Sequence, residues 1–190
     1  MIPGTLPRVV VDGVDVGAPL LALGALTVVL AFAIGLARGR GVRYALWAGL
    51  VFTLAIIGLV TLGSVLTDST GGAPGVNLVP FQEIQRGLDH RSGVAWANLV
   101  GNVLLFVPLG LAVGGLVRGG FWARLVAATA TGVVLSAAIE LVQYTGGRVA
   151  DIDDIILNGL GALVGGVVAA TAAALARPGA RARSSEVDSA

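Results

Sequence analysis

The chain contains no cysteine and no lysine, and its single histidine is His90. Without cysteine, no disulfide, thiolate metal site or cysteine nucleophile can form, and one histidine is too few for a histidine-rich zinc site. A Walker-type phosphate loop requires a lysine, so the sequence also excludes that class of nucleotide site. No histidine accompanies Ser136 in its apolar segment, which leaves a serine-hydrolase arrangement without support.

Charged residues are also scarce. They make up 12% of the 190 residues, whereas 56% are hydrophobic and the mean hydropathy is +0.91. Because soluble globular domains are far more polar, we predict an integral membrane protein with an all-α, polytopic helix bundle. The net charge of +1 gives no reason to expect a nucleic-acid partner. A composition rich in Ala, Val, Leu, Gly and Arg is typical of a GC-rich bacterial genome, so the expected location is the bacterial plasma membrane.

Five apolar segments are long enough to cross a hydrocarbon core of roughly 30 Å as helices. We expect residues 1–17 to form a short extracellular segment that is not cleaved, because they lack the basic stretch that precedes the core of a signal peptide. We expect the polar residues 177–190 to form a disordered cytoplasmic tail. The five predicted spans cover residues 18–37, 44–66, 96–117, 121–144 and 152–176.

The arginines are distributed unequally between the two sides of these spans. One side carries Arg38, Arg40, Arg43, Arg118, Arg124, Arg177, Arg181 and Arg183, and the other carries Arg8, Arg86, Arg91 and Arg148. Because short cytoplasmic loops are enriched in basic residues, this count places the N-terminus outside and the C-terminus in the cytoplasm. The long connection 67–95 and the turn 145–151 then both face outward.

The outer connection 67–95 has two parts. Its first part is rich in glycine and proline, as in turns, and its second part places Phe81, Ile84 and Leu88 at helical spacing. This pattern predicts a short amphipathic helix in the outer membrane interface. His90 is interpreted as a solvated residue of this loop. The residues expected to anchor the spans at the membrane boundary are Trp47, Trp96, Trp122 and Tyr144.

Polar residues recur at helical spacing in the outer halves of the last three predicted spans. An aspartate at the centre of a membrane helix costs about 2.5–3.5 kcal/mol, so such residues predict a functional site. Three- and four-residue spacing brings them to one depth. They are Asn98, Asn102, Glu140, Gln143, Tyr144, Asp151, Asp154 and Asn158. Deeper in the membrane, small residues four apart predict close helix contact. These residues are Gly110, Gly114, Gly161 and Gly165.

Structural roles for some of these residues remain open. Arg148 with Asp151 or Asp153 fits a capping turn, because carboxylates are stabilised at the positive end of a helix dipole. Asp153 points away from the face that the other polar residues share. Asn98 and Asn102 also fit interhelical hydrogen bonding. A purely structural Glu140 is less favoured, since its neighbours are apolar.

Five motifs in a fixed order resemble those of the VanZ-like family. They are N-L-V-P-F at Asn77–Phe81, N-x-x-x-N-x-x-x-F-x-P-x-G at Asn98–Gly110, E-x-x-Q at Glu140–Gln143, R-x-x-D-x-x-D at Arg148–Asp154 and N-x-x-G at Asn158–Gly161. The resemblance covers residues 77–166. We therefore expect a VanZ-like region at 67–176, preceded by two further helices in 18–66. The resemblance implies a link to resistance against the glycopeptide antibiotic teicoplanin, and it adds Asn77 and Phe81 to the candidate ligand-binding residues.

Three hypotheses follow for the polar residues. In an enzyme acting on a lipid-linked cell-wall precursor or a lipid headgroup at the outer leaflet, the catalytic residues would be Glu140, Asp154 and Arg148. Glu140 would be the general acid or base, and Arg148 would hold a phosphate or carboxylate. Asp151 and Asp154, with Asn158, would then hold a divalent cation such as Mg²⁺ or Ca²⁺.

The second hypothesis is a non-enzymatic protein that binds a lipid, an antibiotic or an ion in the same cleft, or a small transporter of such a ligand. The third is a polar cluster that only assembles the helices. In either of the first two, the residues expected to contact the ligand are Asn98, Asn102, Gln143, Asn158, Asn77 and Phe81.

Overall fold

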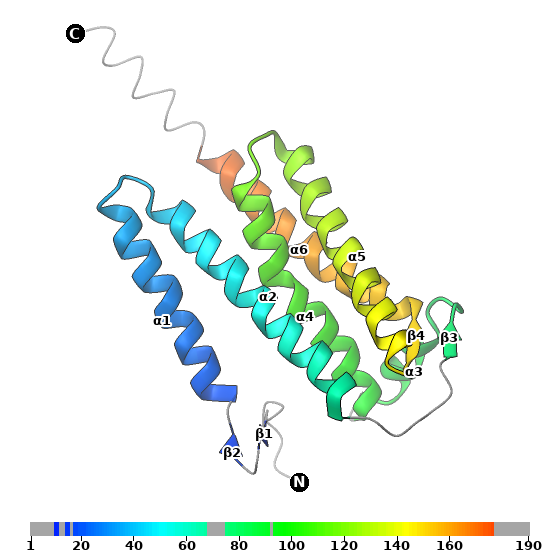
Figure 1. The fold of residues 1–190 in the computed structure, drawn as a ribbon. Coiled ribbons are helices and arrows are strands. Elements are labelled where there is room, and N and C mark those ends of the chain that lie inside the picture. Colours follow the sequence, from blue (N-terminus) through cyan, green and yellow to red (C-terminus); the bar gives the residue numbers. More distant parts are fainter. Residues whose placement is uncertain (1–9, 12–13, 16, 68–74, 92, 177–190) are drawn as a thin grey trace, which may run out of the picture. The chain divides into compact units, whose positions relative to one another are not determined.

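The computed structural model describes residues 10–11, 14–15, 17–67, 75–91 and 93–176. Within them are six helices, namely α1 (Gly17–Leu36), α2 (Gly41–Thr67), α3 (Gln82–Asp89), α4 (Val94–Leu116), α5 (Phe121–Thr145) and α6 (Ile152–Leu175) (Figure 1). The short strands are β1 (Val10–Val11), β2 (Val14–Asp15), β3 (Gly75–Asn77) and β4 (Val149–Asp151). The predictions for most of 1–17 and for the tail 177–190 lie outside the described residues.

Four of the helices are long and apolar enough to cross a membrane: Gly41–Thr61 within α2, and all of α4, α5 and α6. The predicted fold class, an all-α polytopic bundle, is confirmed. The first predicted span is also helical, as α1, but its apolar part with described side chains, Ala22–Leu36, is shorter than the other four. A fifth crossing by α1 therefore stays a prediction.

The chain divides into two compact units, Met1–Phe52 and Thr53–Ala190. In the first unit, α1 packs against the first half of α2 through small residues. A Cβ atom added to Gly24 would overlap the ring of Phe52, and one added to Gly35 would lie 2.8 Å from the Cα of Gly41. The Arg38 guanidinium lies 5.8 Å from the centroid of the Tyr44 ring, a cation–π contact.

In the second unit, α4, α5 and α6 pack around a core whose fully buried residues include Phe106, Leu109, Ala128 and Ala162. Glycines allow the backbones to touch. A Cβ on Gly110 would overlap the carbonyl group of Ala162, and a Cβ on Gly161 or Gly165 would overlap a carbonyl oxygen of α4. These contacts confirm the prediction of close helix packing, in which backbone approach replaces the side-chain interdigitation of larger residues.

The two connections that were expected on one side of the membrane meet at one end of this unit. Strand β3 pairs in parallel with β4, with Gly75 opposite Val149 and Asn77 opposite Asp151. Figure 1 shows both strands beside α3, at the end where α5 ends and α6 begins. This pairing was not predicted, because it joins segments far apart in the sequence that are each only three residues long.

Helix α3 confirms the predicted short helix between the second and third long helices, although it begins after Phe81. It packs on the first turns of α4, where Gly87 is buried. A Cβ on Gly87 would lie 3.1 Å from the carbonyl oxygen of Ala95 and 3.2 Å from the side chain of Leu99.

Arg124 fixes the opposite end of the unit. Its Nη1 donates to the carbonyl oxygens of Gly114 at 2.7 Å and Gly115 at 3.2 Å, and its Nε donates to that of Gly119 at 3.2 Å. The last carbonyls of a helix have no intrahelical donor, so Arg124 satisfies the C-terminal end of α4 from the first turn of α5.

The close contact of α4 with α6 makes Gly110→Ala destabilising. The added methyl has no room, and overpacking of this kind costs about 1–3 kcal/mol. Thermal unfolding of the purified protein in detergent, followed by loss of helical circular dichroism, measures the effect.

Gly101→Ala is the matched control on the same helix, since a Cβ at Gly101 has no neighbour within 4 Å. We expect the control to melt at or above the wild-type temperature, because alanine has the higher helix propensity. Equal melting temperatures for the two variants would contradict the close packing of α4 on α6.

Candidate functional site

The polar residues singled out in the sequence gather at the end of the second unit where α5 ends and where α4 and α6 begin. Asp151, at the end of β4, lies at the centre of their hydrogen bonds. Its Oδ1 accepts from the amide of Asp153 at 2.9 Å, and its Oδ2 accepts from Nδ2 of Asn77 at 3.0 Å. The first bond is an N-cap of α6, in which a side-chain oxygen satisfies a free amide of the first turn.

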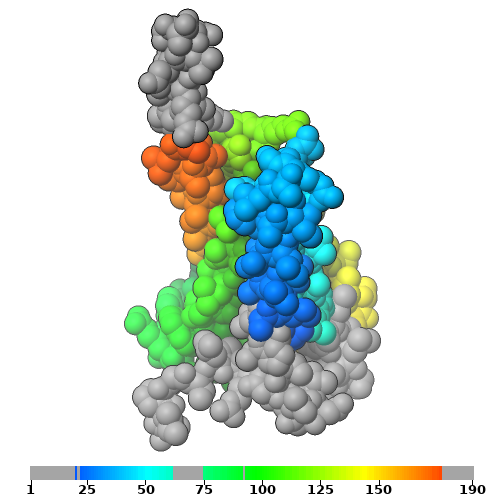
Figure 2. Space-filling model, turned by 90° about the vertical axis from the view of Figure 1, so that its left-hand side faces the viewer, coloured from blue at the N-terminus to red at the C-terminus, as the bar shows by residue number. Residues whose placement is uncertain are grey.

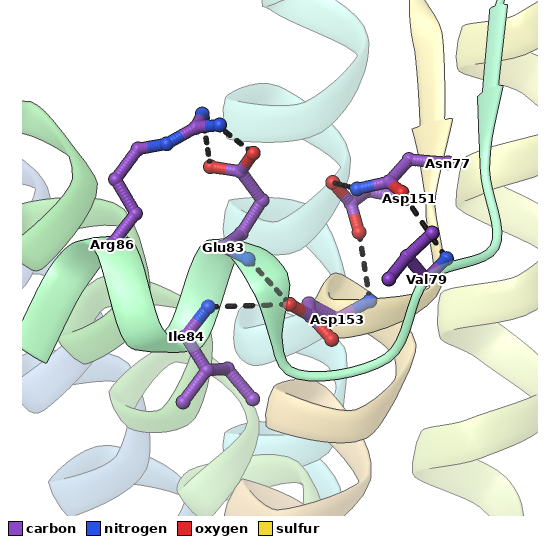
Figure 3. A network of polar contacts seen from close by, with 7 residues as sticks. All are labelled: Asn77, Val79, Glu83, Ile84, Arg86, Asp151 and Asp153. Carbon is purple, nitrogen blue, oxygen red and sulfur yellow. Dashed lines mark hydrogen bonds and ion pairs between the residues drawn. The ribbon is translucent and has the colours of Figure 1, made fainter.

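Asn77 carries these contacts into the outer connection. While its Nδ2 donates to Asp151, its Oδ1 accepts from the amide of Val79 at 3.2 Å, as Figure 3 shows. The side chain therefore closes a turn in its own loop and joins that loop to the start of α6. This role explains Asn77 without a ligand.

Asp153, for which a capping role was left open, caps a helix that the sequence did not indicate. Its side chain is fully buried, and it accepts hydrogen bonds from the amides of Phe81 at 2.6 Å, Glu83 at 2.8 Å and Ile84 at 3.2 Å. Asp153 does cap a helix, but that helix is α3, from which it is separated by about seventy positions. The capping of its own helix is done by Asp151. Figure 3 shows the Asp153 carboxylate beneath the first turn of α3.

The backbone of Phe81 is strained where this cap begins. Its φ of 69° is the only positive value of a non-glycine residue within the described part of the chain. Such a conformation costs about 1–3 kcal/mol and persists only where its surroundings impose it. Here the short hydrogen bond from the Phe81 amide to Asp153 holds the turn, and the Phe81 side chain remains 54% exposed.

Glu140 lies near the end of α5 and is only 5% exposed. Its Oε2 accepts from the amide of Asp151 at 2.8 Å, so it joins α5 to β4. The negative charges of Asp151 and Asp154 repel this carboxylate, and the positive charge of Arg148 attracts it. Arg148 acts on Asp154 in the same way. Glu140, Arg148 and Asp154 therefore lie close enough to interact electrostatically, and the catalytic role suggested for them stays a prediction.

Two further hydrogen bonds join α6 to its neighbours. Nδ2 of Asn102 donates to Oδ1 of Asp154 at 2.6 Å, which links α4 to α6. Nδ2 of Asn158 donates to Oγ of Ser136 at 2.8 Å, which links α5 to α6 in the buried interior. Ser136 is fully buried, and sequence reasoning missed its pairing with Asn158. Asn102 therefore forms a hydrogen bond between two helices, which is one of the two roles that the sequence left open for it.

A cleft of about 150 Å³ opens beside these contacts, between α3, α4, β4 and α6. Asn98, Asp151 and Asp154 of the predicted set line it, together with Glu83, which the sequence analysis missed because it belongs to the outer connection. Gln143 and Arg148 are not among the lining residues. Their backbones are joined by a hydrogen bond of 3.0 Å from the Arg148 amide to the Gln143 carbonyl oxygen, in the turn that follows α5. The full lining is Glu83, Ala95, Asn98, Leu99, Val149, Asp151, Asp154 and Leu157.

The suggested divalent-cation site rests on Asp151 and Asp154, and both carboxylates line this cleft. Asn158, the third suggested ligand, turns to Ser136 instead. Among the described residues, no group of three or more histidine, aspartate or glutamate side chains is arranged to hold a metal ion. Hard cations take six or more oxygen ligands, so two carboxylates would leave most of the coordination to water or to a ligand.

Long apolar helices, packed through glycine and carrying a hydrogen-bonded acidic cluster at one end, define an integral membrane protein of the helix-bundle class. A family model described as VanZ/LLP1 matches residues 44–173, which is more than half of the chain, and the chain belongs to this family. The match begins within α2, so the family region is longer than the stretch 77–166 over which the resemblance was recognised. No curated protein and no solved structure matches the chain significantly.

The cap on α3 generates a prediction. Asp153→Ala removes the acceptor of three amides, at a cost of about 1–3 kcal/mol for each amide that stays shielded from water. We expect faster hydrogen–deuterium exchange in residues 81–89, with Asp153→Asn intermediate because it keeps one acceptor oxygen.

Asp89→Ala is the control, because Asp89 is exposed at the far end of the same helix. Exchange in residues 81–89 that is no faster in Asp153→Ala than in this control would show that α3 does not depend on the cap.

Proposed function

We propose that this protein acts at the outer leaflet of the bacterial plasma membrane and binds the polar part of a membrane lipid or a lipid-linked cell-wall precursor. The observation that carries the proposal is the cleft at the end of the bundle. Half of its lining is polar (Glu83, Asn98, Asp151 and Asp154) and half is apolar (Ala95, Leu99, Val149 and Leu157). Ligand sites commonly combine an apolar wall with a few polar groups that fix orientation.

The charge of the cleft favours one kind of headgroup chemistry. Three of its four polar lining residues are carboxylates, of which Glu83 is paired with Arg86, and no arginine lines the cleft itself. Ionised carboxylates accept hydrogen bonds only, so the cleft suits hydroxyl or ammonium groups better than a phosphate. The amide of Asn98 adds both donors and an acceptor at the α4 wall. Sugar hydroxyls and amino groups of an envelope precursor have this chemistry.

Binding is favoured over catalysis because most of the carboxylates already hold the protein together. Asp153 accepts hydrogen bonds from amides of α3, and Asp151 accepts them from α6 and from Asn77. Glu140 accepts one from the amide of Asp151. Glu140 is also absent from the cleft lining. A general acid or base must come within hydrogen-bond reach of the reacting group, which supports Glu140 as a structural residue.

The enzymatic alternative rests on Asp154. Among the described residues, its Oδ1 accepts from Asn102 and no bond to its Oδ2 is found, although the carboxylate lines the cleft. Asp154 is therefore the best placed of the three residues suggested for catalysis. Formation of product from a labelled lipid precursor would identify an enzyme, because a binding protein changes only where the lipid resides.

A cell-envelope function predicts a glycopeptide phenotype that depends on the cleft. In a sensitive bacterial host, we expect the wild-type chain to raise the inhibitory concentration of teicoplanin. We expect Asn98→Leu and Asp154→Asn to lose most of that increase, since each replaces a polar lining group. Susceptibility is measured at equal membrane abundance, beside the exposed variant Asp89→Asn as control.

Resistance retained by both cleft variants would exclude the cleft from this function. Resistance lost in the control as well would point to a general loss of the protein.

The proposed outward orientation is testable because the chain lacks cysteine. Thr145 and Gly120 are both exposed and lie at opposite ends of α5. We expect a membrane-impermeant maleimide to label Thr145→Cys in intact cells and Gly120→Cys only after permeabilisation. The reverse pattern would place the cleft on the cytoplasmic side.

A further inference from the structure

The turn between β3 and α3 exposes apolar side chains although it lies outside the long helices. Leu78 is 70% exposed, Val79 59% and Phe81 54%. Val76, before the turn, and Leu88, two helical turns after Phe81, are exposed as well. We call these five residues the apolar patch. Connections that face water are normally polar, so several exposed apolar side chains in one short connection mark an interaction surface.

Hydrogen bonds keep the patch in place, so its exposure is not the result of a loose loop. The Val79 amide is held by Asn77, and the Phe81 amide is held by Asp153. The left-handed backbone of Phe81 is part of the same fixed turn. The space-filling view shows the green atoms of the 75–91 segment projecting at the end of α4 (Figure 2).

The place of the patch in the fold identifies its partner. Residues 75–91 lie where α5 ends and where α4 and α6 begin, and all three helices are long and apolar enough to span the bilayer. That end must coincide with a bilayer boundary. A protein partner fits less well, since five side chains are far fewer than the roughly 20–30 residues per side of a stable protein interface.

The polar residues of α3 complete an amphipathic arrangement. Gln82, Gln85, Arg86 and Asp89 are exposed, while Gly87 is buried against α4. Arg86 forms an ion pair with Glu83 at 2.6 Å. The helix thus exposes polar side chains, packs Gly87 against α4 and leaves the apolar side chain of Leu88 exposed. Helices of this kind lie in the plane of the interface.

We propose that the apolar patch inserts into the boundary between the headgroups and the acyl chains of the bilayer. Amphipathic segments bury their apolar face about 5–10 Å at this boundary. Because Glu83 belongs to α3 and lines the cleft, insertion sets the cleft at the depth of the lipid headgroups. This second part rests on the proposed function, and it gives a headgroup a lateral route to Asp154 and Asn98 without leaving the membrane.

The absence of native cysteine allows the depth of single positions to be measured. Nitroxide labels on Leu78→Cys and Val79→Cys, in liposomes of phosphatidylethanolamine and phosphatidylglycerol, report collisions with oxygen, which concentrates in lipid, and with a water-soluble nickel chelate. Gln82→Cys and Gln85→Cys are the controls on the polar face. These four side chains are exposed, so labelling removes no core contact.

We expect oxygen to relax the labels at 78 and 79 more than the nickel chelate does, and the order to reverse at 82 and 85. Nickel accessibility at 78 and 79 equal to that at 85 would overturn the proposal. The depth measurement needs no ligand, so it tests the insertion of the patch independently of the proposed function. Labels at 78 and 79 that prove to be in water would not change the susceptibility results for the cleft variants. Cleft variants that retain resistance would not change the measured depth of the patch.

Discussion

The structure of the site depends on one buried carboxylate that accepts three backbone amides. Asp153 lies in the first turn of α6, yet it organises the outer connection, because without it the first turn of α3 has no acceptor for its amides. Buried polar groups are tolerated only when they are paired, and a carboxylate at a helix N-terminus is among the stronger pairings. Through this residue the position of α3, and with it one wall of the cleft, is set by α6.

The remaining acidic residues follow the same logic. Glu140 and Asp151 each accept a hydrogen bond from a backbone amide, and Asp154 accepts one from the side-chain amide of Asn102. Like charges brought together at the end of a membrane bundle repel one another, and this arrangement persists because each carboxylate has a donor and Arg148 adds a positive charge. Asp151 belongs both to this network and to the lining of the cleft, so a mutation there affects the fold and the cleft together. Glu140 does not line the cleft, and it affects the cleft only through its bond to the amide of Asp151.

Hydropathy and helical spacing were sufficient to predict the helices, the glycine contacts and the gathering of Asn102, Glu140 and Asp154 at one depth. These features depend on residues within one helix or on neighbouring helices, where periodicity carries the information. The cap from Asp153 to α3, the β3–β4 pair and the contribution of Glu83 to the cleft were not predictable in this way. Each of these three features joins the outer connection to a segment that is distant in the sequence. The residues that make these contacts follow no helical or alternating pattern. The pairing of Ser136 with Asn158 was missed because a lone hydroxyl in an apolar helix commonly bonds to its own backbone.

The backbone contacts between α4 and α6 restrict how these two helices of this protein can move against each other. Gly110, Gly161 and Gly165 each lie against a backbone carbonyl group of the facing helix, so a rocking motion of one helix against the other would separate surfaces that have no side chains to fill the gap. Alternating access by rigid-body rotation within α4–α6 is therefore disfavoured. If the protein moves a lipid, the lipid would have to pass along the outer surface of α4, α5 and α6. These three helices would keep their positions relative to one another.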